Sequence, residues 1–221
     1  MATDEVLTGY GSRARGLAEM LGTRVDPRDP DRAIVEAWAV DVRGPILDVG
    51  SGTGRWAGRL AELGHEVKGL EPVAEFVEIA RRAHPGVPFR MGSIADLDEP
   101  DSAGRWSGIL GWYSLIHLAP EEMPAALTIL RRALTGDGSM LLSFFTGPRL
   151  ETFDHPVARA YRWPAHTLAD ALTAAGFVVT GQRTHPGGQH VSVSATPTAT
   201  APAATIPPTP TPGPTLPPTH G

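Results

Sequence analysis

A glycine-rich loop, with an acid 21 residues after its first glycine, has the residue types and spacing of a nucleoside site. Residues 50–54 read Gly-Ser-Gly-Thr-Gly between a short apolar run and a helical pattern, and Glu71 ends the next apolar run. Glycines let a ligand lie against bare backbone, and the start of a helix offers free N–H groups. Because parallel strands end at one edge of a sheet, Glu71 can accept hydrogen bonds from both hydroxyls of a ribose. The alternative is a tight turn beside a solvated acid.

The spacing of the glycines favours S-adenosylmethionine over a dinucleotide. The dinucleotide fingerprint needs a small residue where Arg55 stands, whereas here the third glycine comes early, at Gly54. Asp48 lies two residues before the first glycine, and its charge would repel a pyrophosphate but suit an ammonium group. S-adenosylmethionine carries both an ammonium and a sulfonium. An NAD-dependent oxidoreductase is therefore disfavoured.

Residues that could move a proton follow the fourth and fifth apolar runs. Tyr113 and His117 come after the fourth run, and His155 follows Asp154 in the long segment 146–164. Imidazole titrates near neutrality, so His117 could act as a general base, or it could orient its loop through a backbone hydrogen bond. Tyr113 could pack beside the cofactor rather than transfer a proton. The pair at 154 and 155 could equally brace the loop.

Two further aromatic residues are candidates for binding the substrate. Tyr10, with Arg13 and Arg15, could form a lid over the cofactor, although a solvated helix face explains the arginines equally well. Trp163 could line the pocket of a methyl acceptor or anchor the last helix.

The elements that must position these side chains alternate between strand and helix. Apolar runs predict strands at 45–49, 66–71, 87–91, 109–113 and 140–145, with 177–180 and 190–194 as a final pair. Helix-period segments lie between several of them, which is typical of βαβ units and a parallel sheet. The last two runs, joined by a Pro-Gly-Gly turn, indicate an antiparallel pair. We expect a domain at 1–194, with a helical cap at 1–40.

The rest of the composition narrows the class of protein. Residues 195–221 contain nine prolines and eight threonines but no charged side chain, so we expect a disordered tail. The absence of cysteine excludes disulfide scaffolds, zinc ribbons and cysteine nucleophiles. We expect no metal, because no histidines are spaced as a ligand pair. The formal charge of −5 disfavours a nucleic-acid partner. We expect no membrane partner, because no apolar run approaches the about 20 residues of a membrane span. Since the sequence also lacks a signal peptide, we expect a cytoplasmic protein.

Several runs resemble the class I S-adenosylmethionine-dependent methyltransferases. ILDVGSGTGRWAGRLAELGHEVKGLEPVAEFVEIARR resembles their motif I and second strand, FRMGSIADL their third strand and adenine loop, and GILGWYSLIHL their fourth strand. LRRALTGDGSMLLSFF resembles the helix and strand that follow. The likeness covers about residues 10–194 and is closest to a bacterial branch of small-molecule methyltransferases. It implies a Rossmann-like α/β fold with a seven-stranded, mostly parallel sheet, an antiparallel last strand, and helices on both faces.

The resemblance also implies roles for individual residues. Asp48 would lie near the amino-acid end of S-adenosylmethionine, Glu71 would hold its ribose, and Trp112 would lie under its methionine side. The backbone of the loop would approach the cofactor through Gly50, Ser51, Gly52 and Gly54, and the adenine would lie between Ser93 and Ile94. Ser93 stands where many relatives carry an acid.

The resulting hypothesis is an S-adenosylmethionine-dependent methyltransferase, monomeric or homodimeric, that methylates O, N or S of a small molecule. His117 and Tyr113 are its candidate catalytic residues, and Tyr10, His155 and Trp163 its candidate substrate contacts. A binding module that keeps the nucleoside pocket without turnover is the alternative.

Overall fold

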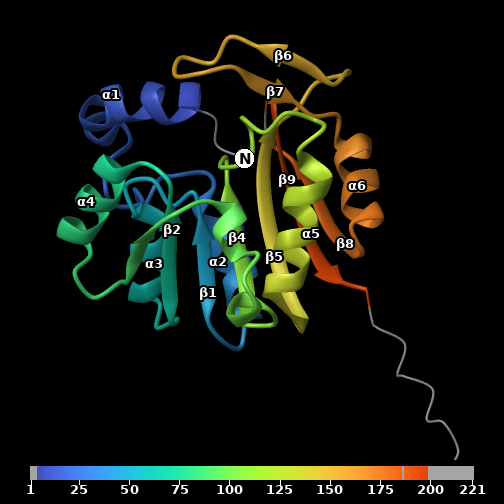
Figure 1. Ribbon diagram of the computed structural model, residues 1–221, viewed down its shortest axis with the longest axis horizontal. Coiled ribbons are helices and arrows are strands. Elements are labelled where there is room, and N and C mark those ends of the chain that lie inside the picture. The colour runs from blue at the N-terminus through green and yellow to red at the C-terminus, as the bar shows by residue number, and fades with distance from the viewer. Residues whose placement is uncertain (1–3, 186, 199–221) are drawn as a thin grey trace, which may run out of the picture.

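A single mixed β-sheet carries the site. In the computed structural model, which describes residues 4–185 and 187–198, nine strands form this sheet (Figure 1). The strands are β1 (Ile46–Val49), β2 (Val67–Glu71), β3 (Phe89–Met91), β4 (Trp106–Trp112), β5 (Leu134–Phe145), β6 (Glu151–Phe153), β7 (Ala160–Arg162), β8 (Phe177–Thr184) and β9 (His190–Pro197). Their order is β3-β2-β1-β4-β5, after which β9 pairs antiparallel with both β5 and β8. The predicted fold class, a mostly parallel sheet with an antiparallel last strand, is confirmed.

Helices cover both faces of the sheet. They are α1 (Asp4–Leu21), α2 (Arg32–Val40), α3 (Arg55–Glu62), α4 (Ala74–Ala83), α5 (Met123–Ala133) and α6 (Ala165–Ala174), with short 3-10 turns at Ile94–Leu97 and Pro100–Ser102. On β5, Leu142 packs in one apolar cluster with α5 and α6, whereas Leu141 packs in another with α2, α3 and α4. Successive residues of a strand face opposite sides, so both faces of the central strands are buried and their sequences are almost continuously apolar.

The carboxyl ends of the parallel strands gather the functional segments. The register pairs Asp48 of β1 with Gly69 of β2 and Leu110 of β4, which brings the loops after these strands to one edge. Figure 1 shows α1 and the β6–β7 hairpin above this edge of the sheet. Of the expected helical cap at 1–40, therefore, α1 lies over the strand ends, whereas α2 packs with the core through Val35 and Ala39.

The segment 146–164, expected to be irregular, contains β6 and β7, so the sheet has nine strands rather than seven. Phe145 at the end of β5 pairs with Arg162 of β7 and packs its ring against Phe153 of β6, 5.0 Å away between centroids. These strands are three residues long each. Strands this short leave too little alternation for the sequence to show them.

The last strand continues past the boundary expected at residue 194. Ala195 is buried opposite Met140 of β5 and Val179 of β8, and pairing with β8 continues to Pro197. Two neighbouring strands thus hold residues that composition alone assigned to the tail. The rest of the expected tail, 199–221, lies outside the described residues.

Candidate active site

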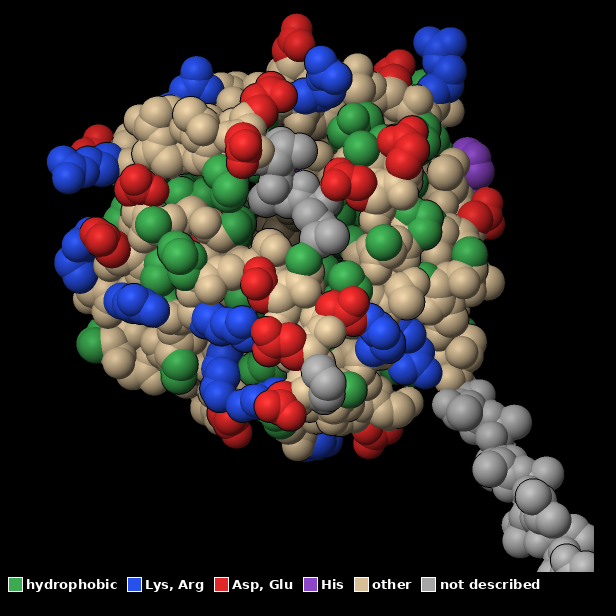
Figure 2. All heavy atoms as spheres, in the orientation of Figure 1, with side chains coloured by type: hydrophobic (Ala, Val, Ile, Leu, Met, Phe, Trp, Pro, Cys, Tyr) green, Lys and Arg blue, Asp and Glu red, His purple; other side chains and the backbone are tan. Residues whose placement is uncertain are grey.

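A cavity of about 370 Å³ lies under α1, at the carboxyl ends of β1, β2 and β4. That is within the usual size range of a small-molecule site. Figure 2 shows the face of the molecule hollowed above the upper end of β4, with Asp and Glu side chains around the hollow. The walls come from α1, the glycine loop, the ends of β2 and β4, and the segment that follows β5.

The glycine loop turns in a way that only glycine permits at low cost. Gly50 and Gly52 have φ values of +66° and +53°. A Cβ on Gly50 would lie 2.4 Å from Cβ of Ser114, whereas one on Gly52 would meet no atom within 4 Å. Both glycines border the cavity. Gly52 therefore leaves an open cradle on the cavity side, as a ligand lying against the backbone requires.

Gly54, expected to approach the cofactor, has a different role. Its φ is +79°, and a Cβ there would lie 2.8 Å from Cζ of Phe89 and 2.9 Å from Cβ of Ala80. It is not among the residues that line the cavity. The glycine is thus needed to turn the chain into α3 while β3 and α4 pack closely behind it. The glycine pattern alone does not distinguish these two reasons.

Asp48 is buried at the end of β1 and compensates for a missing helix cap. The residue before α3 is Gly54, which has no side chain to cap the helix, and Oδ2 of Asp48 instead accepts a hydrogen bond from N of Ala57 at 3.1 Å. Burial raises the pKa of Asp48 to about 7, with a smaller contribution from Glu71. Because Asp48 also borders the cavity, a cation bound there would favour its ionised form.

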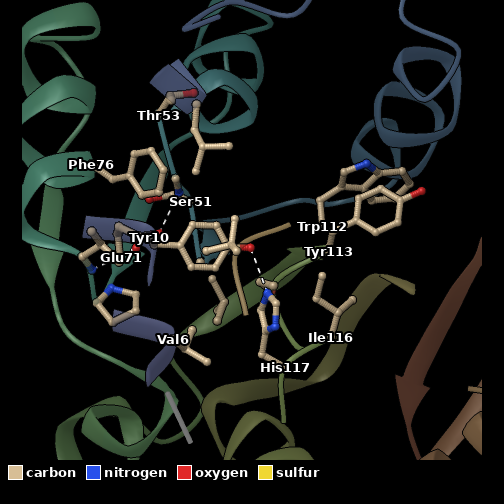
Figure 3. Close-up of a pocket in the computed structure, with 18 of the residues that line it drawn as sticks. Val6, Tyr10, Ser51, Thr53, Glu71, Phe76, Trp112, Tyr113, Ile116 and His117 are labelled. Carbon is tan, nitrogen blue, oxygen red and sulfur yellow. Dashed lines mark hydrogen bonds between the residues drawn. The ribbon is translucent and has the colours of Figure 1, made fainter. Parts of the chain in front are cut away.

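Glu71 is buried at the end of β2 and holds the loop with both oxygens. Its Oε2 accepts from N of Gly52 at 2.8 Å, and its Oε1 accepts from N of Val73 at 2.9 Å (Figure 3). Each carboxylate oxygen keeps a second acceptor position. Burial raises the pKa of Glu71 to about 7. The contact between Glu71 and a ribose stays a prediction. It would use only the second acceptor positions of the two carboxylate oxygens.

Ser93 and Ile94 border the cavity beyond β3, and Asp96 fixes their turn. Oδ2 of Asp96 accepts from both N and Oγ of Ser93, at 2.7 and 3.1 Å. In this capping box the Ser93 hydroxyl donates to Asp96 and accepts from the backbone N–H of Asp96, which leaves one lone pair for another donor. We did not identify Asp96 from the sequence, although Ser-Ile-Ala-Asp matches the S-x-x-D/E spacing of a capping box.

Two buried hydroxyls test whether the cavity suits a polar nucleoside. Oγ of Ser51 and Oγ of Ser114 have no hydrogen-bond partner among the described residues, and both serines line the cavity. Buried polar atoms without partners are rare in folded proteins. Both oxygens are buried behind the loop, however, so the fit to a nucleoside rests on the open side of Gly52 and on the carboxylate of Glu71.

Trp112 and Tyr113 line the cavity, but their polar atoms point away from it. Nε1 of Trp112 donates to Asp31 at 3.0 Å, and the other oxygen of Asp31 lies 3.2 Å from Nδ1 of His185. Tyr113 has a φ of +54°, and its hydroxyl lies 3.1 Å from Nδ1 of His190. In Figure 3 its ring lies beside Trp112, away from His117. The ring of Tyr113 thus forms part of the cavity wall, and its hydroxyl is engaged with His190.

His117 is held at both ring nitrogens. Nδ1 lies 2.7 Å from the carbonyl oxygen of Arg159, and Nε2 lies 2.9 Å from the hydroxyl of Tyr10 on α1 (Figure 3). Burial lowers the pKa of His117 and lowers that of the adjacent His155 to about 4. The two imidazole centroids are 5.1 Å apart. The expected candidates Tyr10, His117 and His155 are thus brought together on one side of the cavity.

Comparison with known proteins assigns the middle of the chain to a family. Residues 46–138 match the model of a methyltransferase domain. The chain therefore contains a methyltransferase domain. A Streptomyces fradiae dTDP-3-amino-3,6-dideoxy-alpha-D-glucopyranose N,N-dimethyltransferase is 32% identical over 61% of this chain and 48% of its own length. Alignments to other curated relatives cover 48% and 64% of those proteins, so the chain matches about half to two thirds of their length.

Solved structures show that the fold is shared more widely than the sequence. A Burkholderia thailandensis 1,6-didemethyltoxoflavin-N1-methyltransferase, solved with its acceptor and S-adenosylhomocysteine, has a TM-score of 0.73 at 23% identity, covering 88% of each chain. The cyclase SpnF has a TM-score of 0.74 at 18% identity, covering 89% of this chain and 97% of its own. At such identities the likeness shows the fold alone, so the chemistry must be argued from the site.

Trp163, a candidate substrate contact, lies outside the cavity lining. Its side chain is 3% exposed and packs in the apolar cluster under α6, with its ring 6.3 Å from that of Phe144. This burial favours the alternative of anchoring the last helix, because the backbone N–H of Trp163 donates to the carbonyl of Phe145 and its side chain packs inward immediately before α6.

The described residues offer little beyond this cavity for other kinds of site. In residues 4–185 and 187–198, no group of three or more His, Asp or Glu side chains is placed to hold a metal ion. No helix in the same ranges has the length and apolar character of a membrane span.

Proposed function

We propose that this chain transfers a methyl group from S-adenosylmethionine to O, N or S of a small molecule. The observation that carries the proposal is that one cavity joins the Gly52–Glu71 cradle to the Tyr10–His117 pair. Glu71, Gly52, Ser93 and Ile94 would hold the nucleoside end. When bound, S-adenosylmethionine supplies a methyl group on a positively charged sulfur, and transfer depends mainly on holding the acceptor in line with it.

The residues at the other end of the cavity support a role in proton removal. His117 lines the cavity with its Nε2 bonded to the Tyr10 hydroxyl, whereas its Nδ1 is fixed on a backbone carbonyl. A lowered pKa keeps the imidazole uncharged near neutral pH, the form that can take a proton. The formal charge of −5 and the cavity size support a small molecule rather than a nucleic acid as the acceptor.

Calorimetric titration with S-adenosylmethionine tests the proposal, using Gly52→Ala and Gly104→Ala as matched variants. Both glycines have positive φ, +53° and +61°, and neither substitution meets an atom within 4 Å. Each should therefore cost about 1 kcal/mol of strain, but only the first places a methyl group in the cavity. We expect Gly52→Ala to weaken binding by about tenfold or more, equivalent to about 1.4 kcal/mol, and Gly104→Ala to leave binding unchanged.

Methyl transfer itself is measured with methyl-labelled S-adenosylmethionine and an extract of small metabolites. Labelled products that appear with wild type and disappear with Gly52→Ala would support the proposal. Absence of S-adenosylmethionine binding would reject it. Tight binding without transfer to any acceptor would favour the alternative, a binding module that retains the nucleoside pocket.

A further inference from the structure

The half of the cavity away from the glycine loop is built mainly from rings. Tyr10, His117, Phe145 and His155 line it together with Ile116 and Val157. The rings of Tyr10 and His117 meet edge to face at 5.4 Å, those of His117 and His155 at 5.1 Å, and that of Phe145 lies 6.0 Å from His155. Rings arranged in this way pack well against another flat ring, through stacked or edge-to-face contacts.

This ring-lined half contains no charge to pair with a charged acceptor. Among the described residues that line the cavity, the charged side chains are Asp48, Arg55 and Glu71, all at the glycine-loop end, and Arg55 is paired with Asp29 at 3.0 Å. The two imidazoles are uncharged near neutral pH, because burial lowers their pKa values. An ion that left water for this space would find no counter-charge. The acidic side chains around the hollow in Figure 2 further disfavour an anion.

The hydrogen bonds at His117 define the direction in which a proton can move. The carbonyl of Arg159 can only accept, so Nδ1 of His117 carries the hydrogen and Nε2 presents a lone pair. The hydroxyl of Tyr10 therefore donates to Nε2 and keeps its own lone pairs for a further donor. Burial raises the pKa of Tyr10 to about 12, so it stays a hydroxyl. Tyr10 can accept a proton only while it passes its own to His117.

We propose that the acceptor is an uncharged, flat aromatic or heteroaromatic molecule whose N–H or O–H proton passes through the Tyr10 hydroxyl to Nε2 of His117. The proposal rests on the proposed function. A bond forms between the acceptor N or O and the methyl carbon, while the bond from that carbon to sulfur breaks and leaves its electron pair on sulfur. The acceptor proton moves to Tyr10, and the Tyr10 proton moves to His117. The methylated acceptor and S-adenosylhomocysteine are released, and the proton passes to water.

The groups that face His117 are few. They are Tyr10, the carbonyl of Arg159, the uncharged ring of His155, and the charge of Glu5, whose effect on the pKa of His117 is smaller than that of burial. His117 must be uncharged to take the proton, so kcat should rise with pH as its imidazolium loses a proton. This rise should be centred below 6.5, the ordinary pKa of histidine.

Matched probes test the class of acceptor. 7-Hydroxycoumarin and lumazine are uncharged flat heteroaromatics with an ionisable O–H or N–H, and 7-hydroxycoumarin-3-carboxylate adds one negative charge to the same ring. We expect an uncharged probe to be methylated, with kcat/KM for 7-hydroxycoumarin at least about tenfold above that for its carboxylate, since a buried unpaired charge is costly. Calorimetry with S-adenosylhomocysteine present should show the same preference in Kd. Methylation of neither uncharged probe, or preference for the carboxylate, would overturn the proposal.

Variants test the proton path separately. Tyr10→Phe and His117→Asn should each lower kcat by about a hundredfold, the usual scale of general-base catalysis, and His117→Asn should abolish the rise of kcat with pH. Tyr161→Phe and His166→Asn remove the same groups from β7 and α6, outside the cavity lining, and should change neither value. An unchanged kcat in Tyr10→Phe, or a persistent pH limb in His117→Asn, would overturn the relay. Failure of wild type to bind S-adenosylmethionine would instead reject the proposed function.

Discussion

Asp48 and Glu71 are two buried acids that face one cavity without a buried cation between them among the described residues. Each has a pKa of about 7 instead of its ordinary value of 3.8 or 4.5, mainly because burial penalises the charged form. A ligand that brings an ammonium, a sulfonium and two hydroxyl donors would stabilise the ionised carboxylates. The acids therefore favour that ligand more strongly as the pH rises towards 8, because their protons are then more easily lost.

The raised pKa of Glu71 predicts a pH-dependent cost to the ligand-free protein. Between about pH 4.5 and 7 the folded state keeps a proton that the unfolded state has released, so this residue's contribution to stability is full below 4.5 and falls as the pH rises to 7. The lowered pKa of His155 makes its own contribution to stability rise with pH, which opposes the effect of Glu71. The effect of Glu71 is therefore isolated by comparing wild type with Glu71→Gln.

Urea unfolding at a series of pH values measures this difference. We expect the free energy of unfolding of wild type minus that of Glu71→Gln to fall between about pH 5 and pH 8. The exposed Glu78→Gln on α4 serves as the control and should give a difference that stays flat. If the difference in the free energy of unfolding between wild type and Glu71→Gln were also independent of pH, the buried and protonated state of Glu71 would be contradicted.

The spacing of residues in the sequence predicted more of the cofactor end of the site than of the acceptor end. Asp48 and Glu71 lie in strands that are adjacent in the sheet, and Gly52 lies in the loop after the first of them, so their positions relative to β1 and β2 are enough to bring them together. The inward direction of Trp163 and the partner of the Tyr113 hydroxyl depend on packing against α6 and β9. No local pattern determines such contacts, so the sequence left two roles open for each of these residues.

At the scale of elements, α1 is tied to the body at the turn that follows it. Oγ1 of Thr53, in the glycine loop, donates to the carbonyl of Gly22 at 2.7 Å, and Nε2 of His84 lies 2.7 Å from the carbonyl of Thr23. Farther along the helix, Arg13 bonds the carbonyl of Pro156. The loop that borders the cavity thus also holds the helix that covers it.

Replacing Thr53 with Val should loosen α1. The hydroxyl is buried, so its loss leaves a carbonyl short of a partner and should lower the free energy of unfolding by about 1 to 2 kcal/mol. Amide hydrogen exchange in residues 4–21 should accelerate in particular. Thr173→Val, which removes an exposed hydroxyl bonded only within α6, provides the control. Equal exchange of α1 in both variants would show that Thr53 does not hold the helix.

The centres of the strands could be predicted from apolar runs, but their ends could not. β4 begins at Trp106, before the expected start at 109, because Trp106 pairs with Leu134. β5 begins at that same Leu134, before the expected start at 140. Strand ends depend on which partner lies alongside, and this information is not local in sequence.

At the scale of the whole molecule, the end of β9 predicts where the chain can be shortened. A chain ending at residue 198 keeps the buried Ala195 and the pairing of 195–197 with β8, whereas a chain ending at 194 loses both. The lost burial and pairing should lower the free energy of unfolding of the shorter chain by about 1 to 2 kcal/mol. We therefore expect its Tm to be lower by several degrees. Thermal unfolding of the two chains measures this, and identical Tm values would contradict the boundary at 197.

The antiparallel placement of β9 has a consequence for biosynthesis. Of the strands in the described residues, β9 is made last, and it lies between β5 and β8 as an interior strand of the sheet. Until residue 197 has left the ribosome, one edge of β5 stays unpaired, and its apolar stretch, Met140 to Phe145, is a template for other extended chains. A nascent or prematurely ended chain is therefore the form of this protein most exposed to aggregation and to capture by chaperones.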